Sequence, residues 1–199
     1  IMGYGHIRKN KHELQFYFKE KLDAYKFQND FKQVFFHEFI NVRKGDFCYY
    51  CSICSVNLIN LLIFLGAPVG NKIIQEVKVP KWLLYASNNL KKEFLSTIIG
   101  NEGSKPQNGR WRIQFVLSKE KQYVDSLLDF LNNIRELLYQ FNITTTHIQL
   151  RTQPKRHFCG RFYFKGKENI HKFYNEFAFL YATEKQEVLE SLIKRDSLK

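Results

Sequence analysis

Residues 89–104 read Asn-Leu-Lys-Lys-Glu-Phe-Leu-Ser-Thr-Ile-Ile-Gly-Asn-Glu-Gly-Ser. The apolar residues in this stretch recur at helical spacing, so we expect a helix over residues 88–101, with Ser87 or Asn88 as its N-cap. The apolar stripe of the expected helix consists of Leu90, Phe94, Leu95, Ile98 and Ile99.

An acidic residue comes at the end of this helix. Gly103 is expected to stop the helix, which puts Glu102 at the C-terminal end, where the helix dipole disfavours a negative charge. We therefore expect a positive group beside Glu102, for which a hard divalent metal ion is suited. A solvated Glu102 in a turn explains the same residues equally well in isolation.

Two segments about 100 residues apart alternate in the manner of strands with one covered face. Residues 12–21 place Leu14, Phe16 and Phe18 on one side, and residues 110–117 place Trp111, Ile113, Phe115 and Leu117 on one side. Strict alternation of this kind is typical of a strand that packs one face on a core.

The segments around these strands repeat as well. Helices are expected at 25–39, 56–65, 122–138, 168–181 and 184–194, and further strands at 47–53, 147–151 and 158–165. Each half is thus a mixed α+β pattern of strand pairs and helices, repeated once. We expect the halves to span residues 1–78 and 79–199.

The polar sides of the second-half strands are basic. They carry Arg, Lys, Gln, His and Tyr, and Asp and Glu are absent from all three expected strands. These side chains suit phosphates and base edges of duplex DNA, although an ordinary solvated sheet face is the alternative. The residues in question are Arg110, Arg112, Gln114, His147, Gln149, Arg151, Arg161, Tyr163 and Lys165.

Residues 94–104 resemble the dodecapeptide motif of the LAGLIDADG homing endonucleases, in the archaeal and intein-associated branch. Residues 62–72 with 79–82, Ser118 to Lys121, and residues 170–193 resemble other parts of the same family. The resemblance implies a pseudo-twofold tandem repeat of αββαββα units, with two antiparallel, saddle-shaped sheets that form a DNA-binding surface.

The resemblance also implies an activity and its site. In this family one acid from each half holds divalent metal, Mg²⁺ or Mn²⁺, for hydrolysis of the DNA backbone, and a basic residue from each half assists. By local match the metal-binding positions are Glu102, Asn101 and Gly3, and the basic residues are Lys119 and Lys19. The implied partner is double-stranded DNA. The protein is expected to bind it as a monomer and to have no membrane partner.

The first motif departs from the family pattern. Residues 1–6, Ile-Met-Gly-Tyr-Gly-His, look like the tail of such a motif, with Gly5 matching Gly103 and Tyr4 matching Glu102. A neutral phenol therefore stands at an acidic position, so Tyr4 belongs to the expected catalytic set as a substitution that weakens it. A nicking enzyme, an inactive DNA-binding remnant and an intron-RNA maturase stay open as alternatives.

The expected DNA contacts combine these polar faces with the neighbouring turns and loops. They are His6, Arg8, Lys9, Gln15, Tyr17, Lys105, Arg110, Arg112, Gln114, Gln149, Arg151, Lys155, Arg156, Arg161, Tyr163 and Lys165.

Composition sets wider limits on function. The 199 residues include 31 Lys+Arg against 19 Asp+Glu, a formal net charge of +12, which favours a polyanionic partner over a purely structural module. No run of about 18 apolar residues or signal peptide is evident, and four cysteines do not make a disulfide scaffold, so we expect a reducing, non-secreted location in the cytoplasm or an organelle. The Cys48-x-x-Cys51-x-x-Cys54 run is more typical of packed strand thiols than of a metal site, because residues three apart on a strand face opposite sides.

Overall fold

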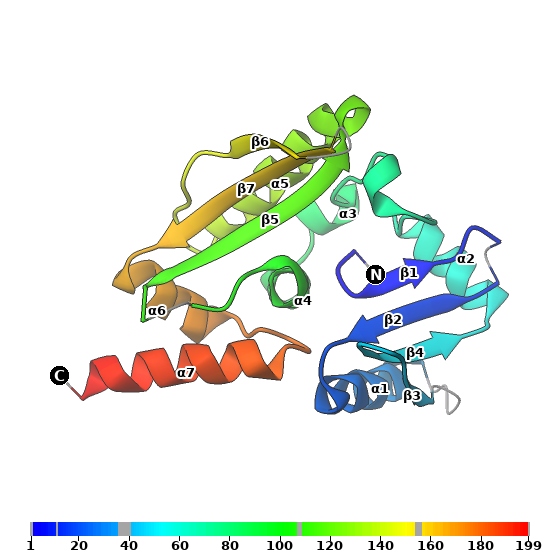
Figure 1. The fold of residues 1–199 in the computed structure, drawn as a ribbon, viewed down its shortest axis with the longest axis horizontal. Coiled ribbons are helices and arrows are strands. Elements are labelled where there is room, and N and C mark those ends of the chain that lie inside the picture. Colours follow the sequence, from blue (N-terminus) through cyan, green and yellow to red (C-terminus); the bar gives the residue numbers. More distant parts are fainter. Residues whose placement is uncertain (1, 11, 36–40, 107–108, 154–156, 199) are drawn as a thin grey trace. The chain divides into compact units, whose positions relative to one another are not determined.

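A computed structural model describes the chain except residues 1, 11, 36–40, 107–108, 154–156 and 199. The chain divides into two compact units, each with its own sheet (Figure 1). Unit 1 comprises residues 1–71 together with Tyr181–Thr183. Unit 2 comprises Lys72–Leu180 and Glu184–Lys199.

Unit 1 is a four-stranded antiparallel sheet with two helices. In chain order its elements are β1 (Gly5–Ile7), β2 (Leu14–Phe18), α1 (Lys21–Phe35), β3 (Val42–Lys44), β4 (Tyr49–Ile53) and α2 (Val56–Phe64). The strand order is β1-β2-β4-β3. The inward side chains of β2 and β4 form one core with residues of α1 and α2, as their alternation predicts.

Unit 2 is a three-stranded antiparallel sheet, in the order β5-β7-β6, with helices around it. Its elements are η1 (Lys72–Ile74), α3 (Lys81–Leu84), α4 (Asn88–Glu102), β5 (Arg112–Glu120), η2 (Lys121–Tyr123), α5 (Val124–Tyr139), β6 (Gln149–Gln153), β7 (His157–Lys165), α6 (Lys167–Glu176) and α7 (Thr183–Ser197). In Figure 1, α5 lies behind the sheet. Gly160 allows this close approach, because a Cβ at that position would lie 2.6 Å from the Leu131 Cδ1 atom of α5.

The registers of the two sheets confirm the internal repeat. Gly5 of β1 pairs with Phe16 of β2, and Gly103 forms an antiparallel bridge with Phe115 of β5. The next strand in each sheet pairs at the same point, with Cys51 opposite Phe16 and Phe162 opposite Phe115. The equivalence of Gly5 with Gly103, and hence of Tyr4 with Glu102, therefore rests on strand pairing as well as on sequence.

Several element boundaries differ from expectation. The first helix begins at Lys21 instead of residue 25, and the helix expected over residues 168–181 ends at Glu176. Phe47 is 96% exposed and lies outside β4, which begins at Tyr49. The short strand β3 was not predicted, since three residues are too few for alternation to be recognised. In the described part of the chain, no helix combines the length and apolar character needed to cross a membrane.

Candidate nucleic-acid interface

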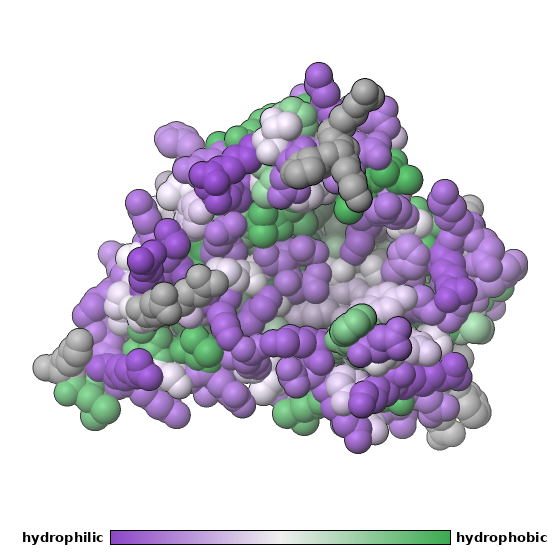
Figure 2. All heavy atoms as spheres, viewed as in Figure 1, coloured by the Kyte–Doolittle hydropathy of each residue, from purple (hydrophilic) through white to green (hydrophobic). Residues whose placement is uncertain are grey.

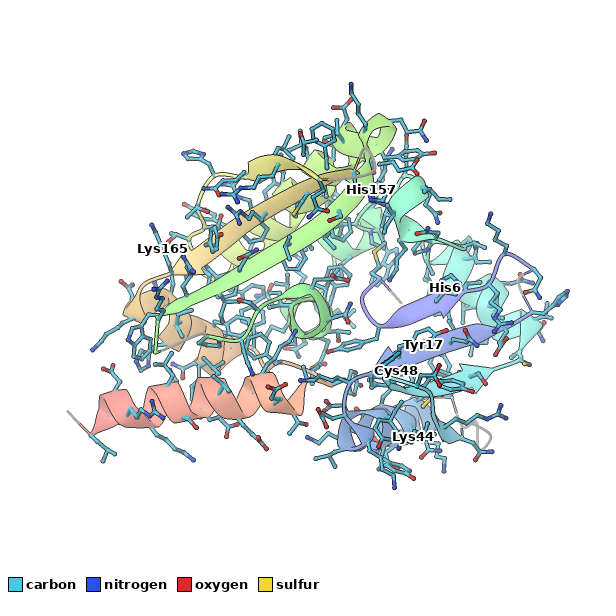
Figure 3. All side chains as sticks on the ribbon, viewed as in Figure 1. His6, Tyr17, Lys44, Cys48, His157 and Lys165 are labelled. Atoms are coloured by element: carbon cyan, nitrogen blue, oxygen red, sulfur yellow. The ribbon has the colours of Figure 1, made fainter. Side chains whose placement is uncertain are left out.

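The outer face of the unit 2 sheet brings basic and amide side chains together. Arg112 is paired with Lys165, Gln114 with Tyr163, and Gln149 with Arg161, so residues from all three strands share this face. We call this set the basic face. It consists of Arg112, Gln114, Gln149, Arg151, Arg161, Tyr163 and Lys165. Figure 3 labels His157 and Lys165 at the two ends of β7, between which the basic face extends.

Two guanidinium groups flank one aromatic ring at the centre of the basic face. The Cζ atom of Arg112 lies 4.9 Å from the ring centroid of Tyr163, and that of Arg161 lies 5.6 Å from the same centroid. Arg161 Nε also donates to Gln149 Oε1 at 3.2 Å. A guanidinium has five N–H donors, so these contacts orient both arginines while most of their donors stay available to a bound anion or base.

The expectation that these strands carry no acid is wrong in one place. Strand β5 continues to Glu120, which is paired with His157 at the end of the face and accepts a hydrogen bond from Gln122 Nε2 at 3.3 Å. The alternation that predicted residues 110–117 fails at Ser118 and Lys119, which is why the strand looked shorter. Glu120 lies beyond the rows that form the basic face, whose own members include no carboxylate. Hydrophilic residues cover most of the surface visible in Figure 2.

The unit 1 sheet carries a different, less basic face. Tyr17 is paired with Tyr50, and Arg43 of β3 is paired with Tyr50 on its other side. Gln15 is only 6% exposed, and its amide is engaged by Tyr17 Oη and by Glu13. Figure 3 labels His6, Tyr17 and Lys44 on β1, β2 and β3. Sequence reasoning missed Arg43 because β3 was not recognised, and it did not single out Tyr50 although the strand over residues 47–53 was expected.

The remaining expected contacts are scattered around these sheets. Lys9 is exposed in the β1–β2 turn, and Arg110 is exposed just before β5. Arg8 pairs with Glu13 at 3.0 Å, and Lys105 pairs with Glu184 of α7. Lys155 and Arg156 lie outside the described residues.

The C-terminal end of α4 has the compensating positive group that its dipole requires. Lys185 Nζ donates to the carbonyl oxygens of Gly100 at 2.8 Å, Asn101 at 3.1 Å and Gly103 at 2.6 Å. This ammonium caps the helix, so the expected cation is a side chain of the protein. Gly103 is required here, because a Cβ would lie 2.4 Å from the Ile99 carbonyl oxygen.

Glu102 itself is half-buried beside this cap. Its Oε1 atom accepts a hydrogen bond from Asn101 Nδ2 at 2.7 Å. Burial raises the pKa of Glu102, while the charge of Lys72, the bond from Asn101 and the charge of Lys185 oppose the rise. Sequence reasoning did not identify Lys72 or Lys185 as site residues, since both come from segments distant from the motif.

Lys119 is buried inside unit 2, where its ammonium group donates hydrogen bonds to the backbone. Its side chain is on β5, the residue is 5% exposed, and Nζ donates to the carbonyl oxygens of Gln75, at 2.7 Å, and of Lys72. Burial, with the charge of Lys72 added, lowers the pKa of Lys119 to about 8. These bonds fix residues 72–75 to β5, so the geometry gives Lys119 an anchoring role. The catalytic role expected for Lys119 stays a prediction.

Tyr4, the residue of unit 1 that is equivalent to Glu102, packs among aromatic rings. The Tyr4 ring stacks on Phe18, with centroids 5.3 Å apart, and meets the edge of Tyr181 at 6.0 Å. Tyr4 is thus an aromatic packed against the unit 1 core. Phe16 faces Gly5 and Phe115 faces Gly103, so these two phenylalanines are equivalent positions, and counting on from them makes Glu20, one residue beyond Lys19, the equivalent of Lys119. Lys19 and Gly3 belong to unit 1, and their expected roles stay predictions.

The residues at the end of α4 do not fit a divalent metal centre of their own. Mg²⁺ and Mn²⁺ are held by several oxygen ligands, often carboxylates. No group of three or more His, Cys, Asp and Glu lies together among the residues that the structure describes. The carboxylate of Glu102 is instead subject to the charges of Lys72 and Lys185, which oppose the arrival of another cation.

Comparison with solved structures identifies the fold. The chain superposes on a structure of the homing endonuclease I-DmoI in complex with DNA and Ca, with a TM-score of 0.54, 13% identity, and 87% of this chain and 80% of that chain covered. It also superposes on the N-terminal LAGLIDADG domain of WhiA, with a TM-score of 0.51, 14% identity, and 92% and 75% of the two chains covered. The chain has the LAGLIDADG fold. The α+β expectation with two antiparallel sheets is confirmed.

The curated proteins that the chain matches in sequence have unrelated names. The chain is 29% identical to the tRNA-splicing ligase RtcB of Methanocaldococcus jannaschii over 158 residues, which are 74% of this chain and 16% of that protein. It is 31% identical to the replication factor C small subunit of the same organism over 86 residues, 42% of this chain and 5% of that protein. It is 26% identical to RNA polymerase subunit Rpo1N of that organism over 143 residues, 69% of this chain and 11% of that protein. No family model matches the chain.

Proposed function

We propose that this chain binds double-stranded DNA through the basic face of unit 2, as part of a LAGLIDADG protein of the homing-endonuclease type. The observation that carries the proposal is the set of Arg, Lys and Gln side chains aligned across three strands around Tyr163. Arginine can pair with phosphates or with guanine, and glutamine with adenine, so one face offers both affinity and base readout. A twisted pair of strands is narrow enough for the major groove.

Two further observations support this proposal. The neighbour I-DmoI was crystallised with DNA, and the likeness covers 87% of this chain. The net charge of +12 also gives the attraction for phosphates that dominates affinity for DNA. We propose a monomer, since one chain supplies both LAGLIDADG-type sheets.

We infer that the chain is a module of a kind carried inside larger proteins, and the lengths over which the relatives match support this inference. An RNA ligase, a replication factor and an RNA polymerase subunit have no common activity in their names, yet each matches this chain over 5–16% of its own length. A segment shared by otherwise unrelated proteins is best explained as an insert that moves between genes. This supports the intein-associated branch that the motif at residues 94–104 resembles.

Replacing Arg112 or Arg161 by alanine should weaken binding to the cognate duplex by about 1–3 kcal/mol in each case, because each substitution removes one guanidinium group from the basic face. Fluorescence anisotropy with a labelled duplex that spans the uninterrupted host-gene junction measures the change. Arg195→Ala is the matched control, since it removes the same charge from α7, outside the sheet. Equal losses in all three variants would mean that the basic face makes no specific contact.

Hydrolysis of one DNA strand is a second candidate function, which rests on the resemblance of residues 94–104 to the LAGLIDADG motif, since Glu102 beside Lys72 and Lys185 does not make a divalent metal centre of its own. Glu102 lies directly before Gly103, at the register position where the sheet of unit 2 begins, and its equivalent Tyr4 is packed among aromatic rings. With a phenol in one half, cutting of both strands is not expected.

Removing divalent metal should leave DNA affinity unchanged, within about twofold, because the proposed contacts are made by the side chains of the basic face. The measurement is the same anisotropy titration with Mg²⁺ and with EDTA, beside a supercoiled plasmid that carries the junction sequence. At most nicked circles are expected, and Glu102→Gln should abolish them without changing affinity. Linear product from the native chain would show that Tyr4 does not disable its half, and affinity that disappears with EDTA would contradict metal-independent binding.

A further inference from the structure

One aliphatic side chain stands among the polar residues of the outer face of the unit 2 sheet. Strands β5 and β7 lie side by side, with α5 behind them (Figure 1), and Val116 of β5 is paired with Arg161 of β7. Phe115, one residue earlier, is fully buried and stacks on Phe162, so Val116 points away from the core. Among the described residues of the three strands, no other aliphatic side chain lies on this outer face.

The polar side chains around Val116 are bonded to each other. Arg161 Nε, in the same row of the sheet, donates to Gln149 Oε1 at 3.2 Å. Ser118, the next residue on the outer side of β5, donates from Oγ to Gln153 Oε1 at 3.4 Å. Val116 is partly exposed, so its methyl groups form a small apolar spot between these two bonded pairs.

Duplex DNA offers one apolar group to such a spot. The C5-methyl group of thymine lies on the base edge in the major groove, and apolar side chains read it by direct contact. Paired strands lie about 5 Å apart, and successive base pairs about 3.4 Å apart. A methyl group against Val116 therefore belongs to the base pair that Arg161 contacts or to the next one.

We propose that Val116 reads the 5-methyl group of a thymine in the duplex bound by the basic face. The proposal rests on the proposed function and adds to it one position of the target sequence. The alternative is that Val116 serves only as a strand-forming residue, since β-branched side chains are favoured in strands. Contact with the methyl group separates the two, because a strand-forming residue is indifferent to it.

The test uses the labelled junction duplex, in which each thymine in turn is replaced by deoxyuridine. This replacement removes only the 5-methyl group and keeps the base pair with all its hydrogen-bonding atoms. For the native chain, replacement at the position that faces Val116 should weaken binding by about three- to fivefold, the effect of one buried methyl group. Fluorescence anisotropy measures the affinity for each duplex.

Variants of Val116 assign the sensitive position. Val116→Ser removes both methyl groups of the side chain, so thymine and deoxyuridine at that position should bind equally well. Val116→Ile keeps the apolar contact and should keep the difference between the two duplexes. Leu150→Ser is the matched control, because it removes a 41% exposed apolar side chain from β6, where Leu150 is paired with Gly160 on the side that faces α5. It should leave the difference unchanged.

Three outcomes would overturn the proposal. These are native affinity that no deoxyuridine replacement reduces, a difference that persists at every sensitive position in Val116→Ser, or a difference that disappears equally in Leu150→Ser. Thermal unfolding of each variant shows that the fold is retained. Failure of the duplex proposal is recognised separately, because it appears as unchanged duplex binding in Arg112→Ala and Arg161→Ala.

Discussion

Replacing Lys119 by methionine is expected to lower the free energy of unfolding by about 2–4 kcal/mol. The substitution removes a buried ammonium that donates to the carbonyl oxygens of Lys72 and Gln75, and methionine leaves both oxygens without this donor. Hydrogen bonds to charged groups contribute about 1.5–3 kcal/mol, and unpaired buried acceptors are costly. Urea unfolding followed by circular dichroism measures the loss.

The matched control is Lys121→Met, an exposed lysine two residues further along the chain, for which a change within about 0.5 kcal/mol is expected. A Lys119→Met protein that keeps its stability and its DNA binding but has lost cleavage would contradict the anchoring role, and would support the catalytic role that the family resemblance implies.

The pH dependence of stability gives a second readout of the same contact. Burial lowers the pKa of Lys119 from the ordinary lysine value of 10.5 to about 8 in the folded protein, so the unfolded chain binds more protons between these values. Stability contributed by this group should therefore rise as the pH increases through about 8 to 10. The rise should be absent in Lys119→Met.

Replacing Asp23 by alanine is expected to destabilise unit 1 by about 2–4 kcal/mol. Asp23 is 2% exposed and accepts hydrogen bonds from the backbone N–H of Thr183, at 3.1 and 3.2 Å, and from its hydroxyl. These bonds attach residues 181–183, which come late in the sequence, to α1 of unit 1. The same segment supplies Tyr181, whose ring packs on Phe27.

Thermal unfolding tests this prediction, with Asp46→Ala in the exposed β3–β4 turn as the control. Asp23→Asn should retain part of the stability, since an amide oxygen can still accept one of the bonds. If Asp23→Ala unfolds at the same temperature as the control, residues 181–183 are not an integral part of unit 1.

The repeat and its strands could be predicted because they follow from local patterns. Alternation predicted the buried Leu14, Phe16 and Phe18 of β2 and Ile113 and Phe115 of β5, although not the burial of Gln15, and the apolar stripe of α4 gave its bounds within one residue. The N-cap at Ser87, which accepts a bond from the Leu90 N–H, is confirmed in the same way. Such signals come from neighbours in sequence, where spacing alone determines the face.

The electrostatics of the site could not be predicted, because they depend on residues distant in sequence. Lys185 reaches the end of α4 from 82–85 positions away, and Lys119 reaches Gln75 across 44 positions. The motif suggested a metal ion as the cation beside Glu102, whereas the structure places lysines there. Tyr4 likewise looked like a lost acid, and its packing on Phe18 shows what the phenol does instead.

The most direct test of the account is the salt dependence of duplex binding by the native chain and by Arg112→Ala/Arg161→Ala. Neutralisation of several phosphates predicts that the logarithm of the binding constant falls steeply and linearly with the logarithm of salt concentration, at about 0.9 per phosphate contacted. The double variant should show a slope smaller by about one to two, with weaker binding throughout. A native slope near zero, or a double variant that matches the native chain in slope and affinity, would contradict DNA binding through the basic face.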